Sequence, residues 1–319
     1  MIESSEQIEE VATPERAPRE TTGRALEINP RRSGIRAAVV EFWRYRRLIP
    51  FFGARFIQKR FARTWLGLLW LPLRPALMLG TRILVFGGLI GIATGDIPYP
   101  LFFVVATAAW QLFYEAAYWS TRSLELNRKL LQRVYVPKLI PIVAAAIPAL
   151  IESAIIALFA VGGLVYYYIR ADYWYVELGI HTLLVPAGLL FMLLFGLGVG
   201  MLTSAAGARA RDVRFGIGYA LGFLYFLTPV IYPLSAVPEN WRPVAELNPL
   251  TGAVEMVKDG LFAGHELSSD AVLVTVFWVL VVWIPGLWLF DRREVDVLNG
   301  RNRRLSRMLR PRRRGAATR

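Results

Sequence analysis

Six long apolar stretches dominate this 319-residue chain and limit what it can fold into. A helix of about 20 apolar residues crosses the hydrocarbon core of a bilayer, and each stretch is near that length. The chain is 55% hydrophobic and only 19% charged, whereas soluble domains carry about 25% charged residues. The sequence therefore predicts an all-α integral membrane protein with six transmembrane helices. The predicted spans lie at about 72–92, 101–121, 139–168, 178–204, 216–235 and 271–290.

Basic residues are distributed unequally between the two sides of these spans. The segments on one side contain 29 Lys and Arg residues in total, and those on the other side contain three. Loops rich in Lys and Arg stay in the cytoplasm during insertion, and an even number of spans places both ends of the chain on the same side. Both termini are therefore expected in the cytoplasm.

The chain divides into four predicted regions. Residues 1–34 are polar and rich in Glu and Thr, so they are expected to form a disordered cytoplasmic tail. Residues 35–64 are expected to form an amphipathic interface segment, residues 65–290 the six-span transmembrane domain, and residues 291–319 a basic cytoplasmic tail with eleven Arg. Such a run can bind nucleic acid. Directly after a span it is better explained as an anchor attracted to anionic membrane lipids, and no nucleic-acid partner is expected.

The segment 51–63 (FFGARFIQKRFAR) lies just before the first span. As a helix it would place its aromatic residues on one face and its basic residues largely on the other. This pattern favours a helix lying in the membrane interface. The alternative is that the segment forms the juxtamembrane tip of the first span.

The segment 228–264 contains five prolines, so it is too interrupted for a span, yet it is too apolar for a free loop. Irregular backbone at membrane depth is tolerated only where protein buries it or where it lines a wet cavity. We therefore expect two short helices, at about 238–246 and 249–261, that re-enter the membrane from outside and form a gate.

Several chemistries are excluded by what the sequence lacks. Without cysteine there is no disulfide, thiol nucleophile or zinc–thiolate site, and the two histidines, His181 and His265, lie far apart in the sequence. The chain has neither a GxxxxGK[ST] phosphate loop nor a GxSxG nucleophile elbow. No cofactor or metal is expected in this chain, which is predicted not to be an enzyme.

Ionisable residues inside predicted spans include Arg82, near the centre of the first span, and Glu115 and Glu152. A lone charge at the bilayer centre costs about 2.5–3.5 kcal/mol on insertion scales, so a partner or water is expected for Arg82. By depth, either carboxylate could meet Arg82. A buried ion pair that holds the bundle together is the first interpretation. The alternatives are the lining of a polar pore, and hydrolytic or transferase chemistry at the two carboxylates.

The fifth predicted span carries aromatic side chains at helical spacing. Tyr219, Phe223 and Phe226 share one face, and Tyr225 and Tyr232 form a second stripe. Aromatic stripes in membrane helices usually reflect packing. The alternative is a pathway wall that stacks against sugar rings, which have apolar C–H faces and a polar hydroxyl rim.

Three sequence motifs resemble those of a known family. They are TWLGLLWLPLRPAL at 64–77, LELNRKLLQRVYVPKLIPIV at 124–143 and TPVIYPLSAVPENWRPVAELNPLTGAVE at 228–255. In this order they resemble the permease subunit of bacterial ABC exporters for polysaccharide and polyol phosphate, the group that exports O-antigen, capsule and wall teichoic acid. The resemblance covers about residues 40–295. The acidic N-terminal extension and the Arg-rich end depart from the family pattern.

The resemblance implies a homodimer in the bacterial inner membrane, in which each copy binds one separate ATPase subunit that holds ATP and Mg²⁺. Spans one and five would enclose the conduit, which is expected to be lined by Arg82, Tyr219, Phe223, Tyr225, Phe226 and Tyr232. The external gate would include Pro229, Trp241, Asn248 and Pro249. Coupling to the ATPase would involve Arg55, Lys59, Arg60, Asn127, Arg128, Lys129, Gln132, Arg133 and Tyr135.

The expected function is ATP-driven export of a lipid-linked polysaccharide across the cytoplasmic membrane. A permease of an ABC drug or lipid exporter, with a narrower pocket, is the first alternative. An intramembrane enzyme acting on lipid-linked sugars is the second, and it would need Glu115 or Glu152 to face a substrate cavity without Arg82 as partner.

Overall fold

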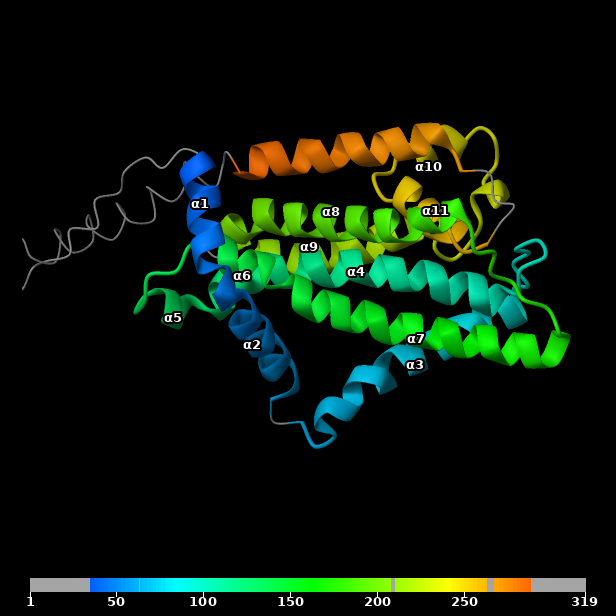
Figure 1. Cartoon of the computed structure of the whole chain (residues 1–319), viewed down its shortest axis with the longest axis horizontal. Coiled ribbons are helices and arrows are strands. Elements are labelled where there is room, and N and C mark those ends of the chain that lie inside the picture. Colours follow the sequence, from blue (N-terminus) through cyan, green and yellow to red (C-terminus); the bar gives the residue numbers. More distant parts are fainter. Residues whose placement is uncertain (1–34, 63, 208–209, 263–266, 288–319) are drawn as a thin grey trace, which may run out of the picture. The chain divides into compact units, whose positions relative to one another are not determined.

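The structure is a computed structural model that describes residues 35–62, 64–207, 210–262 and 267–287. Within these ranges the regular elements are all helices, which confirms the predicted all-α class (Figure 1). The two predicted tails, at 1–34 and 291–319, lie outside the described residues.

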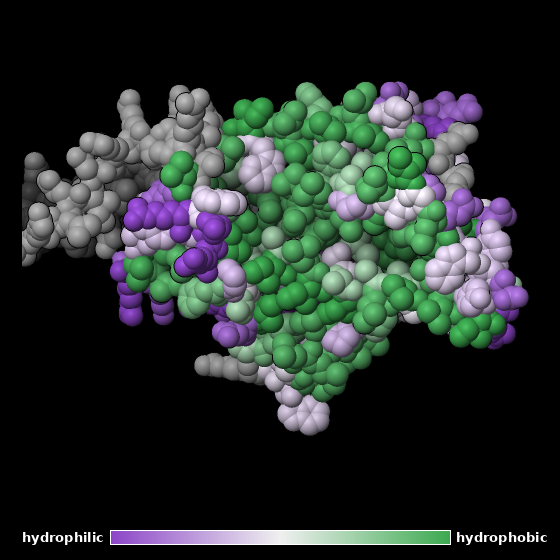
Figure 2. All heavy atoms as spheres, viewed as in Figure 1, coloured by the Kyte–Doolittle hydropathy of each residue, from purple (hydrophilic) through white to green (hydrophobic). Residues whose placement is uncertain are grey.

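Five helical segments of the described chain are long and apolar enough to cross a membrane. The first is Gly67–Leu89, which includes α3 (Trp70–Arg82), and the second is Tyr99–Leu126, which is α4. The third is Leu139–Ala171, which includes α6 (Leu139–Val143) and α7 (Ala146–Ala171). The fourth is Ile180–Ser204, which includes most of α8 (Leu184–Gly207), and the fifth is Ser269–Leu287. These segments confirm five of the six predicted spans. Figure 2 shows apolar side chains covering the middle of the visible face and polar ones gathered at both ends, as a membrane protein requires.

The predicted span at 216–235 differs from the structure in length. It corresponds to α9 (Arg211–Leu227), which has only 17 residues. The helix ends because Pro229 disfavours the α conformation at the residue before it, and Thr228 is extended, with φ −91° and ψ 138°. This helix alone is about 25 Å long, slightly less than the thickness of the hydrocarbon core.

Helix α4 forms the centre of the bundle. It packs against α7 and α8, and 83% of its most apolar window is buried, compared with 11% for the segment containing α3. The close contact between α4 and α8 depends on glycine. A Cβ atom at Gly200 would lie 2.0 Å from Cβ of Ser120, so only glycine lets the two backbones approach this closely. Within the described ranges, the peripheral α3 is left with an extensive surface that no other helix covers.

Two helices precede the first span: α1 (Ile35–Tyr45) and α2 (Ile49–Phe61). Figure 1 shows both helices crossing the long helices near one end of the bundle rather than running parallel to them. Phe52 and Phe56 of α2 are fully buried, and α2 packs against α6 and α7. The predicted amphipathic helix is therefore present, and its aromatic face is held by the bundle.

Three short helices lie in the connections. Helix α5 (Arg128–Leu131) follows α4 at the end of the bundle near α1, whereas α10 (Arg242–Glu246) and α11 (Thr251–Asp259) lie at the opposite end (Figure 1). The last two correspond to the two short helices predicted from the proline-rich segment. All nine residues of α11 are buried, and the helix packs against α8 and α4. It is thus part of the core.

Candidate functional site

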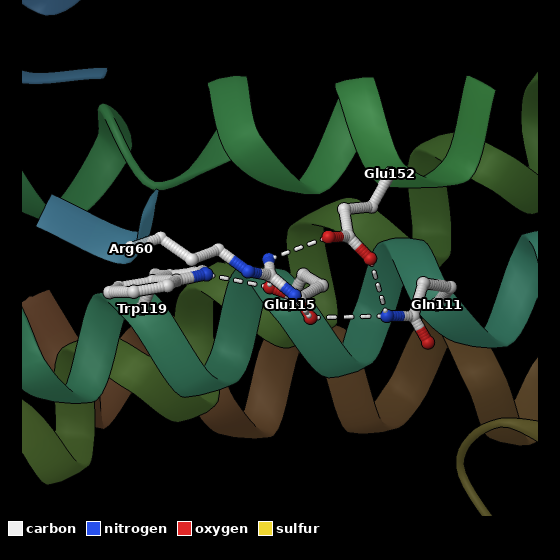
Figure 3. Close-up of polar contacts among 5 residues, drawn as sticks. All are labelled: Arg60, Gln111, Glu115, Trp119 and Glu152. Carbon is white, nitrogen blue, oxygen red and sulfur yellow. Dashed lines mark hydrogen bonds and ion pairs between the residues drawn. The ribbon is translucent and has the colours of Figure 1, made fainter. Parts of the chain in front are cut away.

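Five polar side chains from three helices form a cluster inside the bundle (Figure 3). Nη1 of Arg60, on α2, lies 2.9 Å from Oε2 of Glu115 on α4 and 2.7 Å from Oε1 of Glu152 on α7. Gln111 donates from Nε2 to Oε1 of Glu115 and to Oε2 of Glu152, at 3.1 Å in both cases. The indole of Trp119 donates to Oε2 of Glu115 at 2.6 Å. We call these five residues the charge cluster.

The carboxylates of the charge cluster are almost completely removed from solvent. Glu115 is 2% exposed and Glu152 is 4% exposed. Burial of an ionised carboxylate is tolerated only where opposite charge and hydrogen-bond donors surround it. Arg60 supplies one positive charge for two acids, and Gln111 and Trp119 supply the additional donors. This arrangement joins α2, α4 and α7 at one point.

The structure corrects the predicted pairing of Arg82 with a buried carboxylate. Arg60 takes that place, and the guanidinium of Arg82 instead lies 4.5 Å from the centroid of the Tyr225 ring. The partner of the carboxylates could not be predicted by counting residues within the spans. Arg60 belongs to α2, which precedes the first span and was expected to face the ATPase. In the structure, the side chain of Arg60 reaches from α2 to Glu115 and Glu152.

A cavity of about 230 Å³ lies beside the charge cluster, between α3, α4, α7 and α9. We call it the α3–α9 cavity. It is lined by Arg74, Pro75, Met78, Leu79 and Arg82 of α3, Thr107, Trp110, Gln111 and Tyr114 of α4, Glu152 and Ile156 of α7, and Gly218, Leu221, Gly222, Tyr225 and Phe226 of α9. Two helices from separate parts of the sequence, α3 and α9, thus line one cavity, whose wall is mostly apolar and includes several polar side chains.

The predicted conduit residues divide into two groups. Tyr219, Phe223 and Phe226 are 81%, 68% and 59% exposed, so they form an aromatic surface on α9 that nothing in the described chain covers. Tyr225 is buried against Trp110, with ring centroids 5.2 Å apart. The half-buried Tyr232 lies beyond the end of α9 and donates its hydroxyl to the Phe226 carbonyl at 3.0 Å. The two stripes therefore face in different directions.

The predicted coupling segment begins where α4 ends. Asn127, the residue that follows α4, is buried and donates from Nδ2 to the Ser123 carbonyl at 2.9 Å. The four other polar residues of this segment that were assigned to coupling are exposed, namely Arg128, Lys129, Gln132 and Arg133. Tyr135 donates its hydroxyl to Oε1 of Glu41, on α1, at 2.7 Å. An exposed basic surface thus lies next to the N-terminal helices.

Two further basic residues of α2 tie it to this segment. Lys59 donates to the carbonyl of Leu126, the last residue of α4. Partial burial and the nearby charge of Arg55 lower the pKa of Lys59 below its ordinary value. Of the three α2 residues assigned to coupling, Arg60 and Lys59 therefore contact the membrane bundle itself, and Arg55 is half-buried beside them.

Hydrogen bonds hold the predicted gate segment in place. Asn248 donates from Nδ2 to Oγ1 of Thr228 at 2.9 Å, and its Oδ1 accepts from the backbone N–H of Leu250 at 3.1 Å. The carbonyl of Pro229 accepts a hydrogen bond from Nζ of Lys258 at 3.2 Å, and Pro249 is half-buried. Trp241, in contrast, is 65% exposed.

Sequence reasoning missed three buried charges on α11: Glu255, Lys258 and Asp259. Lys258 forms an ion pair with Glu255 and lies 4.5 Å from the centroid of the Phe102 ring. Burial, followed by the nearby charge of Glu255, raises the pKa of Asp259 to about 7. The spacing of Glu255 and Lys258, three residues apart in a short apolar helix, was the available signal.

A sequence model of the ABC-2 type transporter family matches residues 51–262. The chain belongs to this family. The matched region of the ABC-2 permease begins within α2 and ends just after α11, so it contains the whole charge cluster and every residue that lines the α3–α9 cavity.

Named relatives of this ABC-2 permease match over most of their length. The polysialic acid transport protein KpsM of Escherichia coli is 22% identical over 244 residues, which cover 76% of this chain and 92% of KpsM. The O-antigen export system permease protein RfbA of Myxococcus xanthus is 26% identical over 262 residues, covering 80% and 96%. RfbA of Klebsiella pneumoniae is 21% identical over 237 residues, covering 74% and 88%. In such systems the permease is the membrane subunit, and ATPase activity resides in a partner subunit.

Proposed function

We propose that this ABC-2 permease exports a lipid-linked polysaccharide, of the O-antigen, capsule or teichoic-acid type, across the bacterial cytoplasmic membrane. The observation that carries the proposal is the near full-length match to two kinds of permease named for polysialic acid transport and O-antigen export. It gains support from the exposed aromatic surface of α9, because sugar rings stack well on aromatic side chains.

The proposed assembly is a homodimer with two copies of an ATPase subunit, which binds ATP and Mg²⁺. Only 11% of the apolar window of the segment containing α3 is buried, and α9 exposes Tyr219, Phe223 and Phe226. In a dimer these surfaces of the two copies would face each other and enclose the conduit. In a membrane such a surface contacts either lipid or another protein. Contact between two copies is then favoured by close packing of their side chains rather than by exclusion of water.

In the proposed topology, α9 and the extended residues after it complete a sixth span, and both termini lie in the cytoplasm. This orientation follows from the excess of Lys and Arg on one side of the spans. It places α5 and the N-terminal helices toward the ATPase, and α10 and α11 at the outer gate. Closure of the ATPase dimer would then act on α5 and α2, and the motion would reach α4 and α7 through Arg60.

Deletion of the gene for this permease tests the proposed function in cells. We expect the lipid-linked polymer to disappear from the cell surface and to accumulate inside, with recovery on expression of the intact chain. Surface labelling of the polymer on whole cells, compared with total polymer after lysis, measures both pools. Normal surface polymer together with a new sensitivity to small toxic compounds would favour a drug exporter instead.

A further inference from the structure

Two arginines line the α3–α9 cavity, the exposed Arg74 and the half-buried Arg82, and neither makes a close ion pair with a described carboxylate. Arg74 and Arg82 both come from α3, and their Cα atoms are separated by about 12 Å of helical rise. Arg82 lies over the Tyr225 ring, and neither arginine takes part in an ion pair within the described chain. A positive charge inside a membrane domain is costly without a counter-charge, so such residues mark substrate paths by default.

The one carboxylate at the cavity wall, Glu152, interacts with Arg74 only at longer range, and its close ion pair is with Arg60. Glu152 is held 2.7 Å from Arg60 and accepts a hydrogen bond from Gln111. Glu115 is paired with the same Arg60. The charge cluster and the cavity together contain three guanidinium groups, of Arg60, Arg74 and Arg82. They contain two carboxylates, of Glu115 and Glu152, so the formal net charge of the five groups is +1.

Neutral hydrogen-bond donors complete the wall. Thr107 and Tyr225 are each only 4% exposed, and the Tyr225 hydroxyl lies near both the Thr107 hydroxyl and the Arg82 guanidinium. Neither hydroxyl oxygen makes a hydrogen bond in good geometry within the described chain. Both can donate to a ligand, and buried polar groups of this kind need a partner. Two arginines and two hydroxyls form a donor set that suits the oxygens of a phosphate group.

Building on the proposed function, we propose that the α3–α9 cavity binds the phosphate or diphosphate group that joins the glycan to its lipid. At about 230 Å³ the cavity is smaller than the 300–1,000 Å³ typical of drug-sized ligands, so it suits a head group rather than a length of polymer. In an O-antigen or capsule polymer without phosphate in its repeats, the phosphate linkage occurs once in each molecule and engages the site once. A site for a charged sugar would instead hold every repeat and slow export.

Binding of a prenyl diphosphate tests the proposal. The complex of the permease with its ATPase is placed in nanodiscs of neutral phosphatidylcholine, with ADP and Mg²⁺ saturating the nucleotide sites. Microscale thermophoresis then gives the Kd for farnesyl diphosphate and for farnesol, which has the same chain without the anion. We expect farnesol to bind at least about tenfold more weakly, because charge-assisted hydrogen bonds are each worth about one order of magnitude in affinity.

Substitutions locate the binding. Arg74→Gln and Arg82→Gln should each raise the Kd for farnesyl diphosphate about tenfold, and the double substitution more. Arg170→Gln, an exposed arginine at the end of α7, is the matched control and should leave the Kd unchanged. Equal Kd values for the double variant and the control would overturn the site, as would equal Kd values of the unaltered complex for farnesyl diphosphate and farnesol.

Three competing anions identify the source of the charge. Inorganic pyrophosphate should compete only weakly, because it lacks the chain, and this result supports a lipid-linked phosphate. Competition by an oligosaccharide of glucuronic acid as strong as that by farnesyl diphosphate would overturn the assignment in favour of acidic sugars. Equal competition by phosphatidylglycerol would overturn it in favour of an unspecific lipid site. Failure of the intact complex to export any glycan would refute the proposed function. Normal export by the intact complex, together with an unchanged Kd of the double variant for farnesyl diphosphate, would refute the site alone.

Discussion

Nη1 of Arg60 lies 2.7 Å from Oε1 of Glu152, so a helix that crosses one end of the bundle is tied to the interior of α7. The side chain of Arg60 is 13% exposed and that of Glu152 is 4% exposed, and the same guanidinium contacts Glu115 on α4. A displacement of α2 on its own would leave two carboxylates buried without their cation. The contact therefore favours movement of α2, α4 and α7 as one body.

Replacement of Arg60 by Gln should destabilise the permease strongly. Removal of one side of a buried ion pair typically costs about 3–5 kcal/mol, because the remaining charge is left without compensation. Thermal unfolding of the detergent-solubilised protein, followed by size-exclusion chromatography, measures the loss. Simultaneous Glu115→Gln and Glu152→Gln changes should restore much of it, whereas Arg82→Leu should cost only about 1 kcal/mol, as expected for a cation–π contact. A loss for Arg82→Leu equal to that for Arg60→Gln would contradict this account.

Charge reversal at Arg128, Lys129 and Arg133 should weaken attachment of the ATPase without unfolding the permease. These side chains are exposed around α5, so their removal leaves no buried group unpaired. The measurement is a pull-down of the ATPase with the triple Glu variant, accompanied by its unfolding temperature. Charge reversal at Arg170, at the end of α7, is the control. Undiminished ATPase binding together with normal export would remove α5 from the coupling path.

Substitution of Asn248 by Ala should loosen the outer gate. Its side chain joins Thr228, just after α9, to the start of α11, and it is 8% exposed. Loss of a buried hydrogen-bonding side chain typically costs about 1–3 kcal/mol. Ion flux from proteoliposomes containing the permease and its ATPase without nucleotide should therefore rise, and alanine at Tyr232 and Trp241 should also raise it. Tight vesicles for all three variants would show that this segment does not seal the conduit.

Asp259 should make stability depend on pH. Its folded pKa of about 7 lies above its ordinary value of 3.8, so the folded state binds a proton that the unfolded state releases between these two values. The stability contributed by the protonated acid is therefore lost as pH rises from about 4 to about 7, and it changes little above pH 7. The unfolding temperature should fall between about pH 4 and about pH 7 and then level off, and Asp259→Asn should reduce this dependence. Asp270→Asn, at an exposed acid, should not, and identical pH profiles for both variants would refute the assignment.

Much of the architecture could be predicted from hydrophobic length and proline positions. Five spans, the amphipathic helix containing Phe52 and Phe56, and the two short helices in the segment 228–264 all form in the structure. The end of α9 could also have been predicted from Pro229, because the preceding residue is biased away from helix. These features depend on local sequence.

The partner of the buried carboxylates could not be predicted in the same way. Counting residues gives the depth of Arg82 in its span, but the position of Arg60 depends on how α2 folds back against α6 and α7. The burial of Lys258 and Asp259 likewise depends on packing of α11 against α4 and α8. Contacts between helices distant in the sequence are not recorded in the spacing of apolar residues, which is the pattern that predicts the helices themselves.

Reconstituted export tests the central claim most directly. The permease and its ATPase are inserted into proteoliposomes with radiolabelled lipid-linked glycan, and a glycosidase inside the vesicles reports glycan that has crossed the membrane. The account predicts glycan cleavage that requires ATP and the permease together, since the chain lacks a phosphate loop of its own. Cleavage that proceeds equally without ATP or without the permease, or no cleavage while the complex hydrolyses ATP, would contradict it.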